Sequence, residues 1–100
     1  MATIKLTILY GHPDNADDFE AYYAATHLPL VARSPLRLET SKVVADPAGG
    51  EPAFYRIAVV TFDDMEQMAE QMARPEVQAV SADVANFATG GVTMLLSQVD

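Results

Sequence analysis

The sequence predicts an α+β domain in which a four-stranded antiparallel sheet carries its helices on one face. Apolar residues alternate with other residues in four separate segments, and two further regions show apolar residues at helical spacing. Along the chain these segments follow the order strand, helix, strand, strand, helix, strand. This order corresponds to two split βαβ units, and right-handed crossovers leave few other ways to connect them.

A strand over residues 3–10 and a helix over about residues 16–28 open the chain. The turn formers GHPDN separate the two. Because the ring of Pro29 disfavours helical geometry in the residue before it, we expect the helix to end or kink close to His27. That would place the imidazole at the negative end of the helix dipole, which favours the protonated form.

The next two strands are predicted over residues 36–45 and 54–62, with the turn formers of residues 46–52 between them. Both faces of the segment 54–62 are largely apolar, which is not required in a sheet that has one solvent-exposed face. Since the chain is too short to place helices on both faces, we expect a second copy to cover the other face. Within this strand Arg56 must find an anion or reach solvent. We expect an ion pair with Glu39, across the hairpin or at the dimer contact; anchoring a substrate carboxylate is the alternative.

A second helical region begins near Asp63, and Pro75 divides it into two helices. Met65, Met68 and Met72 lie at helical spacing, and we interpret them as adaptable core residues. After Pro75 the inner face is predicted to consist of Val77, Val80, Val84 and Phe87. A last strand over residues 92–99 completes a ferredoxin-like βαββαβ sandwich.

Length and composition indicate one soluble, cytoplasmic domain over residues 1–100. The chain has no cysteine, which excludes disulfides, thiolate metal sites and a thiol nucleophile. Fourteen acidic against six basic residues give a formal net charge of −8, so the protein repels nucleic acid. No apolar run approaches the roughly 20 residues of a membrane span, and we expect no membrane partner.

The sequence contains no glycine-rich phosphate loop, nucleophile elbow or clustered metal-ligand motif. Its two histidines, His12 and His27, lie on different predicted elements, which argues against a metal site. We therefore expect neither a metal nor a cofactor. Any chemistry would be proton transfer, or oxygenation in which an activated substrate meets dioxygen directly.

The stretch FEAYYAATHLPL, residues 19–30, contains the strongest candidate for a functional side chain. At about 100° per residue, its aromatic residues share one helical stripe with His27 at the edge. Because imidazole titrates near neutral pH, His27 is a candidate general acid or base. The structural alternative, which the residues alone favour, is that His27 caps the helix end or hydrogen-bonds a neighbouring carbonyl.

The segments YGHPDNADDFEAYYAATHLPL and PEVQAVSADVANF resemble the EthD-like family, within the dimeric α/β-barrel superfamily. The shared features are a tyrosine that closes the first strand, a Phe-x-x-Tyr-Tyr-x-x-x-His-x-Pro-Leu helix and an Asp-x-x-Asn-Phe motif. They correspond here to Tyr10, to Phe19, Tyr22, Tyr23, His27, Pro29 and Leu30, and to Asp83, Asn86 and Phe87.

The resemblance implies a homodimeric barrel in which each subunit holds a small hydrophobic or aromatic molecule between helices and sheet. The family is named for a member associated with ethyl tert-butyl ether degradation, and the wider superfamily includes muconolactone-type isomerases and cofactor-independent monooxygenases. In the methylmuconolactone isomerase branch, the histidine of the His-x-Pro motif lies in the active site, which implies that role for His27. That branch also uses a cysteine, which this chain lacks.

We expect the cleft to be lined by Tyr10, Tyr22, Tyr23, Phe62, Asp83 and Phe87. The tyrosines have the alternative of being core residues with satisfied hydroxyls, and for Asp83 an exposed position facing water is the simpler account. For the whole protein, the alternative to an isomerase or monooxygenase is a non-catalytic binding or accessory protein of a catabolic pathway. A cavity of several hundred Å³ with His27 at its wall would support the enzyme. A cleft closed by Tyr23, Phe62 and Phe87 would support the alternative.

Overall fold

The computed structural model describes residues 2–100 and contains one sheet of four strands. The strands are β1 (Ile4–Tyr10), β2 (Arg37–Lys42), β3 (Arg56–Phe62) and β4 (Val92–Gln98). They lie in the order β2-β3-β1-β4, and every neighbouring pair is antiparallel. This is the strand order of a ferredoxin-like sandwich, as the sequence predicts.

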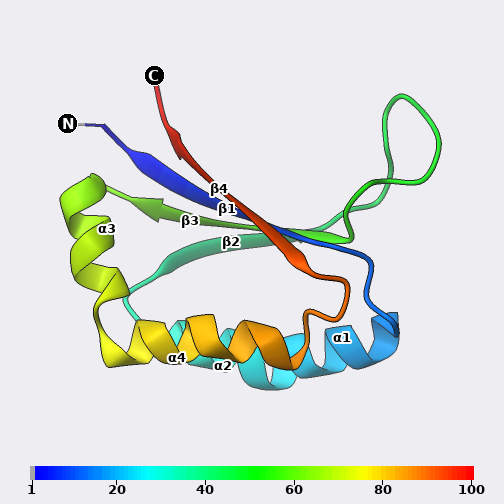
Figure 1. The fold of residues 1–100 in the computed structure, drawn as a ribbon, viewed down its shortest axis with the longest axis horizontal. Helices are drawn as coiled ribbons and strands as arrows, with labels where there is room; N and C mark the ends of the chain where they lie inside the picture. Colours follow the sequence, from blue (N-terminus) through cyan, green and yellow to red (C-terminus); the bar gives the residue numbers. More distant parts are fainter. Residues whose placement is uncertain (1) are drawn as a thin grey trace.

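The helices lie on one side of the sheet (Figure 1). The first helical region consists of α1 (Ala16–Tyr22), a π-helical segment η1 (Tyr23–His27) and α2 (Leu28–Ala32). The second consists of α3 (Met65–Met72), α4 (Pro75–Asp83) and a 3₁₀ turn η2 (Val84–Asn86). In Figure 1, α1, α2 and α4 run beneath the sheet, whereas α3 stands at one end of it. The predicted α+β fold class, with helices on one face, is confirmed.

The register of the sheet defines its two faces. On the helical face, Ile8 of β1 lies opposite Ala58 of β3, and Tyr10 lies opposite Arg56. Side chains of this face form the core with the inner sides of the helices, and the buried members are Ile4, Ile8, Tyr10, Phe19, Tyr23, Ala58, Val60, Phe62, Val84 and Phe87. The other face carries the intervening residues of each strand, and no helix among residues 2–100 covers it (Figure 1).

The first helical region does not end at about residue 28, so that predicted end was wrong; near His27 the chain instead departs from regular α-helix in the segment η1. The chain remains helical to Ala32 because the π-helical segment η1 shifts the hydrogen bonding, so that the N–H of Leu28 donates to the carbonyl of Tyr23. Pro29 then lies in the first turn of α2, where a missing N–H costs little. The imidazole of His27 is therefore within a continuous helical region and not at its negative end.

Two other expectations differ from the structure. Strands β2 and β3 are shorter than predicted, because β2 ends at Lys42, β3 begins at Arg56, and the residues between them form a protruding loop (Figure 1). One backbone bond, from the N–H of Val43 to the carbonyl of Tyr55, extends their pairing. The methionines of α3 are not all core residues: Met65 and Met72 are exposed, at 52% and 37%. None of the helices within residues 2–100 is long and apolar enough to cross a membrane.

Candidate active site

A cavity of about 60 Å³ lies between the sheet and the helices. Most of its wall is aliphatic and comes from all four strands and from α2, α3 and α4. Its two ionisable lining residues are Tyr10 and His27. Tyr10 is the last residue of β1, whereas Phe62 lies opposite Ile4 at the other end of that strand. The cavity therefore has a polar end at Tyr10 and an apolar end at Phe62.

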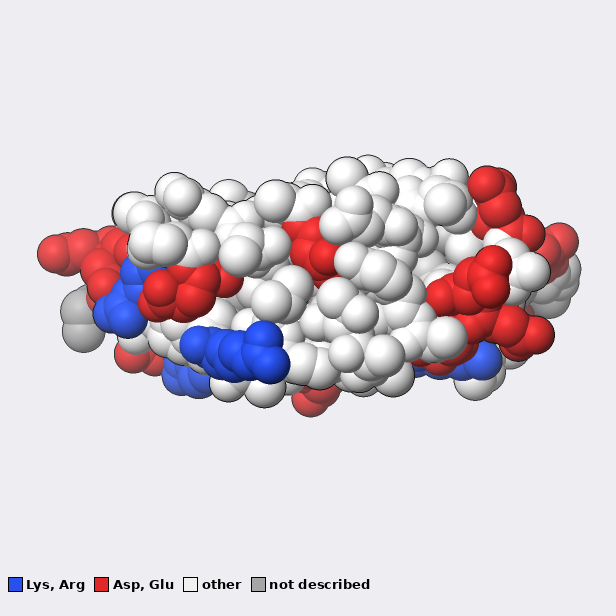
Figure 2. Space-filling view, turned by 90° about the horizontal axis from the view of Figure 1, so that it is seen from below, with Lys and Arg blue, Asp and Glu red and all other residues white. Residues whose placement is uncertain are grey.

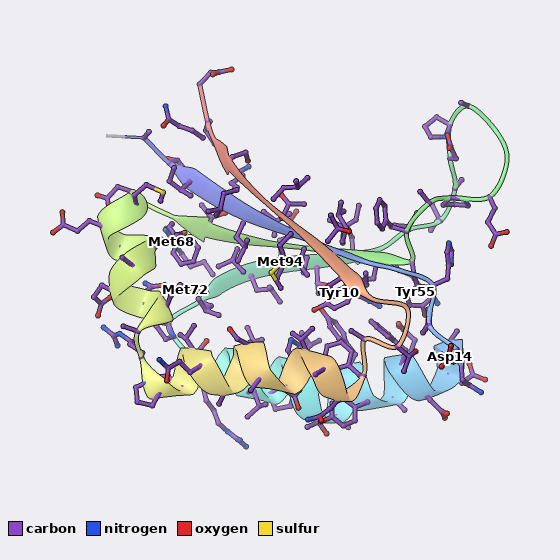
Figure 3. All side chains as sticks on the ribbon, viewed as in Figure 1. Tyr10, Asp14, Tyr55, Met68, Met72 and Met94 are labelled. Carbon is purple, nitrogen blue, oxygen red and sulfur yellow. The ribbon has the colours of Figure 1, made fainter. Side chains whose placement is uncertain are left out.

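The mouth of the cavity is on the side of β4, an edge strand whose seven residues are all exposed. Three lining residues, Met72, Ser81 and Met94, are exposed and mark this opening. Figure 3 shows Met94 reaching from β4 into the layer between sheet and helices, with Met72 toward one end and Tyr10 toward the other. Because methionine side chains are flexible, the mouth can widen without a change in the backbone.

His27 is held by a carboxylate from another helix. Its Nδ1 lies 2.9 Å from Oδ2 of Asp83, and both residues are buried, with 3% and 6% of their surface exposed. Since a carboxylate only accepts, the Nδ1–H of His27 donates this hydrogen bond. The pair fixes the tautomer and leaves Nε2 as the imidazole nitrogen that is open to a ligand.

Asp83 is itself held by two further donors. The hydroxyl of Tyr22 donates to Oδ1 at 2.6 Å, and Nδ2 of Asn86 donates to the same oxygen at 3.1 Å. Burial alone would raise the pKa of Asp83, but the hydrogen bonds from Tyr22, His27 and Asn86 outweigh it and hold the pKa below its ordinary value. Asp83 is therefore a carboxylate at neutral pH, and it favours a proton on His27 Nδ1.

Local structure explains how these residues meet. His27 is the last residue of the π-helical segment, a distortion that adds one residue per turn and is frequent at functional sites. Asp83 is the last residue of α4, directly before the 3₁₀ turn that carries Asn86. Helix α2 packs against α4. This contact brings the π-helical segment that precedes α2 close to the 3₁₀ turn that follows α4, so both irregular segments lie next to the site.

Aromatic rings enclose the imidazole. The ring of Tyr23 stacks on His27 at 5.4 Å between centroids, and the ring of Phe87 lies 4.6 Å away. Tyr10 packs against both of these rings and is almost fully buried. Burial raises the pKa of the Tyr10 hydroxyl, so this group stays protonated at neutral pH and can donate a hydrogen bond into the cavity.

Arg56 does not pair with Glu39, which corrects the sequence-based expectation. Its guanidinium donates to Oε1 of Glu20 at 2.7 Å and to Oγ1 of Thr40 at 3.2 Å, and it lies 4.7 Å from the centre of the Tyr23 ring. The reason is the register, because Glu39 lies opposite Val59 and so points to the other face of the sheet. Arg56 does not line the cavity.

The structure divides the sequence-predicted site residues into three groups. His27, Tyr10 and Phe62 line the cavity. Tyr22 and Asp83 do not line it but form the hydrogen-bonded support of His27, and the expectation that Asp83 faces water was wrong. Tyr23 and Phe87 pack around the imidazole without reaching the cavity.

Asn86 is part of the Asp-x-x-Asn-Phe motif but is not among the site residues predicted from the sequence. Its position three residues after Asp83 on a predicted helix indicates that the two side chains can meet, and in the structure they are hydrogen-bonded. His12, in the loop after β1, contacts the carbonyl of Pro52 at 2.7 Å and does not line the cavity. Within residues 2–100 no cluster of three histidine or acidic side chains could hold a metal ion.

Comparison with known proteins identifies the family. The sequence model of the EthD domain matches residues 15–91. The chain belongs to the EthD family. A Rhodococcus erythropolis protein, an uncharacterized 11.0 kDa protein in the thcB-thcC intergenic region, is 37% identical over 94 residues, which cover 93% of this chain and 91% of that protein.

Solved structures of this EthD-family fold agree with the architecture. An ethyl tert-butyl ether D (EthD) family protein from Bacillus halodurans C-125 is 30% identical, with full coverage of both chains and a TM-score of 0.88. A dimeric ferredoxin-like protein of unknown function from Thermobifida fusca YX shares 16% identity and a TM-score of 0.71, over 98% of this chain and 92% of that one. The second likeness supports the fold alone.

Proposed function

We propose that this EthD-family protein is a homodimer that binds a small hydrophobic, aromatic or lactone-like compound in the cavity, where His27 accepts and donates a proton. One observation carries the proposal. The imidazole that lines the cavity is hydrogen-bonded through Nδ1 to a buried carboxylate, at 2.9 Å from Asp83. Such an arrangement orients a general base and stabilises the imidazolium that forms when Nε2 takes a proton.

The chemistry follows from the two polar groups at one end of the cavity. A ligand carbonyl that accepts a hydrogen bond from the Tyr10 hydroxyl becomes polarised, and its neighbouring C–H becomes more acidic. Nε2 of His27 can remove that proton and return it to another atom of the ligand, which is an isomerisation. A cofactor-free monooxygenase would begin with the same step, after which the deprotonated substrate reacts with dioxygen. Imidazole supplies the base in both cases.

The homodimer is supported by the face of the sheet that lies opposite the helices. Leu9, Ile57 and Val59 form a half-buried apolar group there, and Leu95 of the edge strand is 54% exposed. Leu9 lies directly opposite Ile57, and Val59 and Leu95 both lie opposite Thr7, so the four form one patch, which we name the sheet patch. Two sheet patches packed together would form a dimeric α/β barrel, and the Thermobifida fusca protein of this fold is described as dimeric.

A proton-exchange experiment tests the role of His27. Lactones and ketones that raise the melting temperature are incubated with the protein in D₂O, and ¹H NMR follows deuterium incorporation beside the carbonyl. We expect catalysed exchange in the wild type and a loss of about 100-fold or more in His27→Ala, the usual contribution of general-base catalysis. His12→Ala is the matched control and keeps the wild-type rate. Equal exchange by His27→Ala would remove His27 from the mechanism.

A second candidate function is a non-catalytic binding or accessory protein of a catabolic pathway, and the size of the cavity favours it. At about 60 Å³ the cavity is well below the several hundred Å³ of most ligand sites. Phe62 closes one end, and Tyr23 and Phe87 fill the space beside His27. Compounds that stabilise the wild type without any catalysed exchange would support this function over the enzyme.

A further inference from the structure

The wall of the cavity carries no full charge. Apart from Tyr10, His27 and Ser81, every lining side chain is a hydrocarbon or a thioether, and none is Lys, Arg, Asp or Glu. A ligand in this cavity therefore loses most of its contact with water. Because Ser81 lies at the exposed mouth, buried side chains offer hydrogen bonds only at the His27–Tyr10 end. A neutral molecule tolerates this exchange, whereas an ion that finds no partner does not.

The charges next to the cavity do not favour an anion. Asp83 stands directly behind His27, so a positive charge on the imidazole is already balanced by this carboxylate. The guanidinium of Arg56 is outside the wall and is paired with Glu20. On the helical face, acidic side chains gather toward both ends of the molecule with basic side chains beside them (Figure 2), and the formal net charge is −8.

From this arrangement we infer that the ligand is an uncharged molecule with one carbonyl or hydroxyl oxygen at the His27–Tyr10 end and a hydrocarbon body toward Phe62, and that the cavity rejects carboxylates. The inference rests on the proposed ligand-binding function and narrows its substrate class. Neutral lactones, ketones and phenols fit, whereas lactones that also bear a carboxylate, muconolactones among them, do not. The ligand enters the cavity past Met72 and Met94, the exposed methionines at its mouth.

Methionine methyl NMR on the full-length protein tests this selectivity. The neutral probes are cyclopentanone, γ-valerolactone and phenol, and each is compared with a carboxylate of similar size: cyclopentanecarboxylate, the ring-opened 4-hydroxypentanoate and benzoate. Labelled ε-methyl groups of Met72 and Met94 report on the cavity, and Met65, which is exposed and does not line it, is the internal control. We expect the neutral probes to shift Met72 and Met94 at concentrations at least about tenfold lower than their carboxylates.

A charge introduced at the mouth supplies the converse test. Ser81 lines the cavity and is exposed, so Ser81→Arg adds a cation there without disturbing the core. We expect this variant to gain binding of the carboxylate probes, whereas Ala82→Arg, an equal change in net charge at an exposed neighbour outside the wall, leaves the wild-type preference unchanged. Circular dichroism confirms that both variants are folded.

Two failures of this experiment are distinguishable. If carboxylates shift Met72 and Met94 of the wild type as strongly as the neutral probes, the charge selectivity is wrong while ligand binding stands. If none of the six probes shifts either methionine, the cavity does not bind small oxygenated compounds, and the proposed function is lost together with the inference.

Discussion

Asp83 determines what His27 can do, because the hydrogen bond between them assigns the proton to Nδ1 and leaves Nε2 free. Two neighbours, Tyr22 and Asn86, hold the carboxylate through its other oxygen. The imidazole is therefore oriented by a network whose members come from two helical regions. Such networks restrict side-chain rotation when every member is satisfied, which is the condition for a base with a defined direction.

The low pKa of Asp83 has a measurable consequence for stability. Its pKa in the folded protein lies below the ordinary value of 3.8, so the unfolded chain takes up a proton more readily than the folded one. The carboxylate therefore stabilises the fold above that ordinary value, and this contribution is lost as the pH falls through the folded-state pKa. Urea denaturation should show that the free energy of unfolding decreases more steeply for the wild type than for Asp83→Asn between about pH 5 and pH 2.

The control for this prediction is Asp100→Asn, which removes an exposed carboxylate and should retain the wild-type slope. Parallel curves for the wild type and Asp83→Asn would show that the hydrogen bonds to Asp83 do not stabilise its ionised form.

At the scale of elements, the alternation of apolar residues was sufficient to predict the four strands, because strand periodicity is a local property. The pairing of His27 with Asp83 was not predictable in the same way, since 56 residues separate them and only the packing of α2 on α4 brings them together. The resemblance to the EthD family supplied both residues, but the residues alone favoured a structural role for His27 and an exposed Asp83. The π-helical segment has no periodicity signal of its own, and the sequence therefore predicts that the helix ends or kinks just before Pro29.

In the connection between α4 and β4, the backbone of Gly90 passes close to that of Gly11. From the sequence, these glycines predict turns but not their contact. The backbones of Gly11 and Gly90 cross closely, and a Cβ on Gly90 would clash with the carbonyl oxygen of His12 and lie 2.6 Å from the carbonyl carbon of Gly11. We expect Gly90→Ala to lower the free energy of unfolding by about 2–3 kcal/mol, as overpacking does. Urea denaturation measures the loss.

Gly49→Ala is the comparison for this effect. A Cβ there meets no atom within 4 Å, and only the φ of +93° disfavours alanine. Its cost should therefore be about 1 kcal/mol, from the left-handed backbone alone. Equal losses for the two variants would show that the Gly11–Gly90 crossing is not tight.

At the scale of the whole molecule, the sheet patch is an apolar surface that no helix of residues 2–100 covers. The helical face of the sheet is covered, but Leu9, Ile57, Val59 and Leu95 are left on the other face of a chain of only 100 residues. A domain of this size buries about two-thirds of the surface of its unfolded chain, so burial against a second copy would add substantially to its stability. Edge strand β4 lies beside the cavity mouth, which places any dimer contact along that strand close to the site.

A charge in the centre of the sheet patch tests the dimer. Val59→Glu would bury a carboxylate against its symmetry mate, which costs several kcal/mol without a cationic partner. We expect light scattering to give about twice the chain mass of 10.8 kDa for the wild type at micromolar concentration and the single-chain mass for Val59→Glu. Ala79→Glu, on the exposed surface of α4, makes a similar change of charge and should remain dimeric. A wild type that stays at the single-chain mass would overturn the proposed dimer.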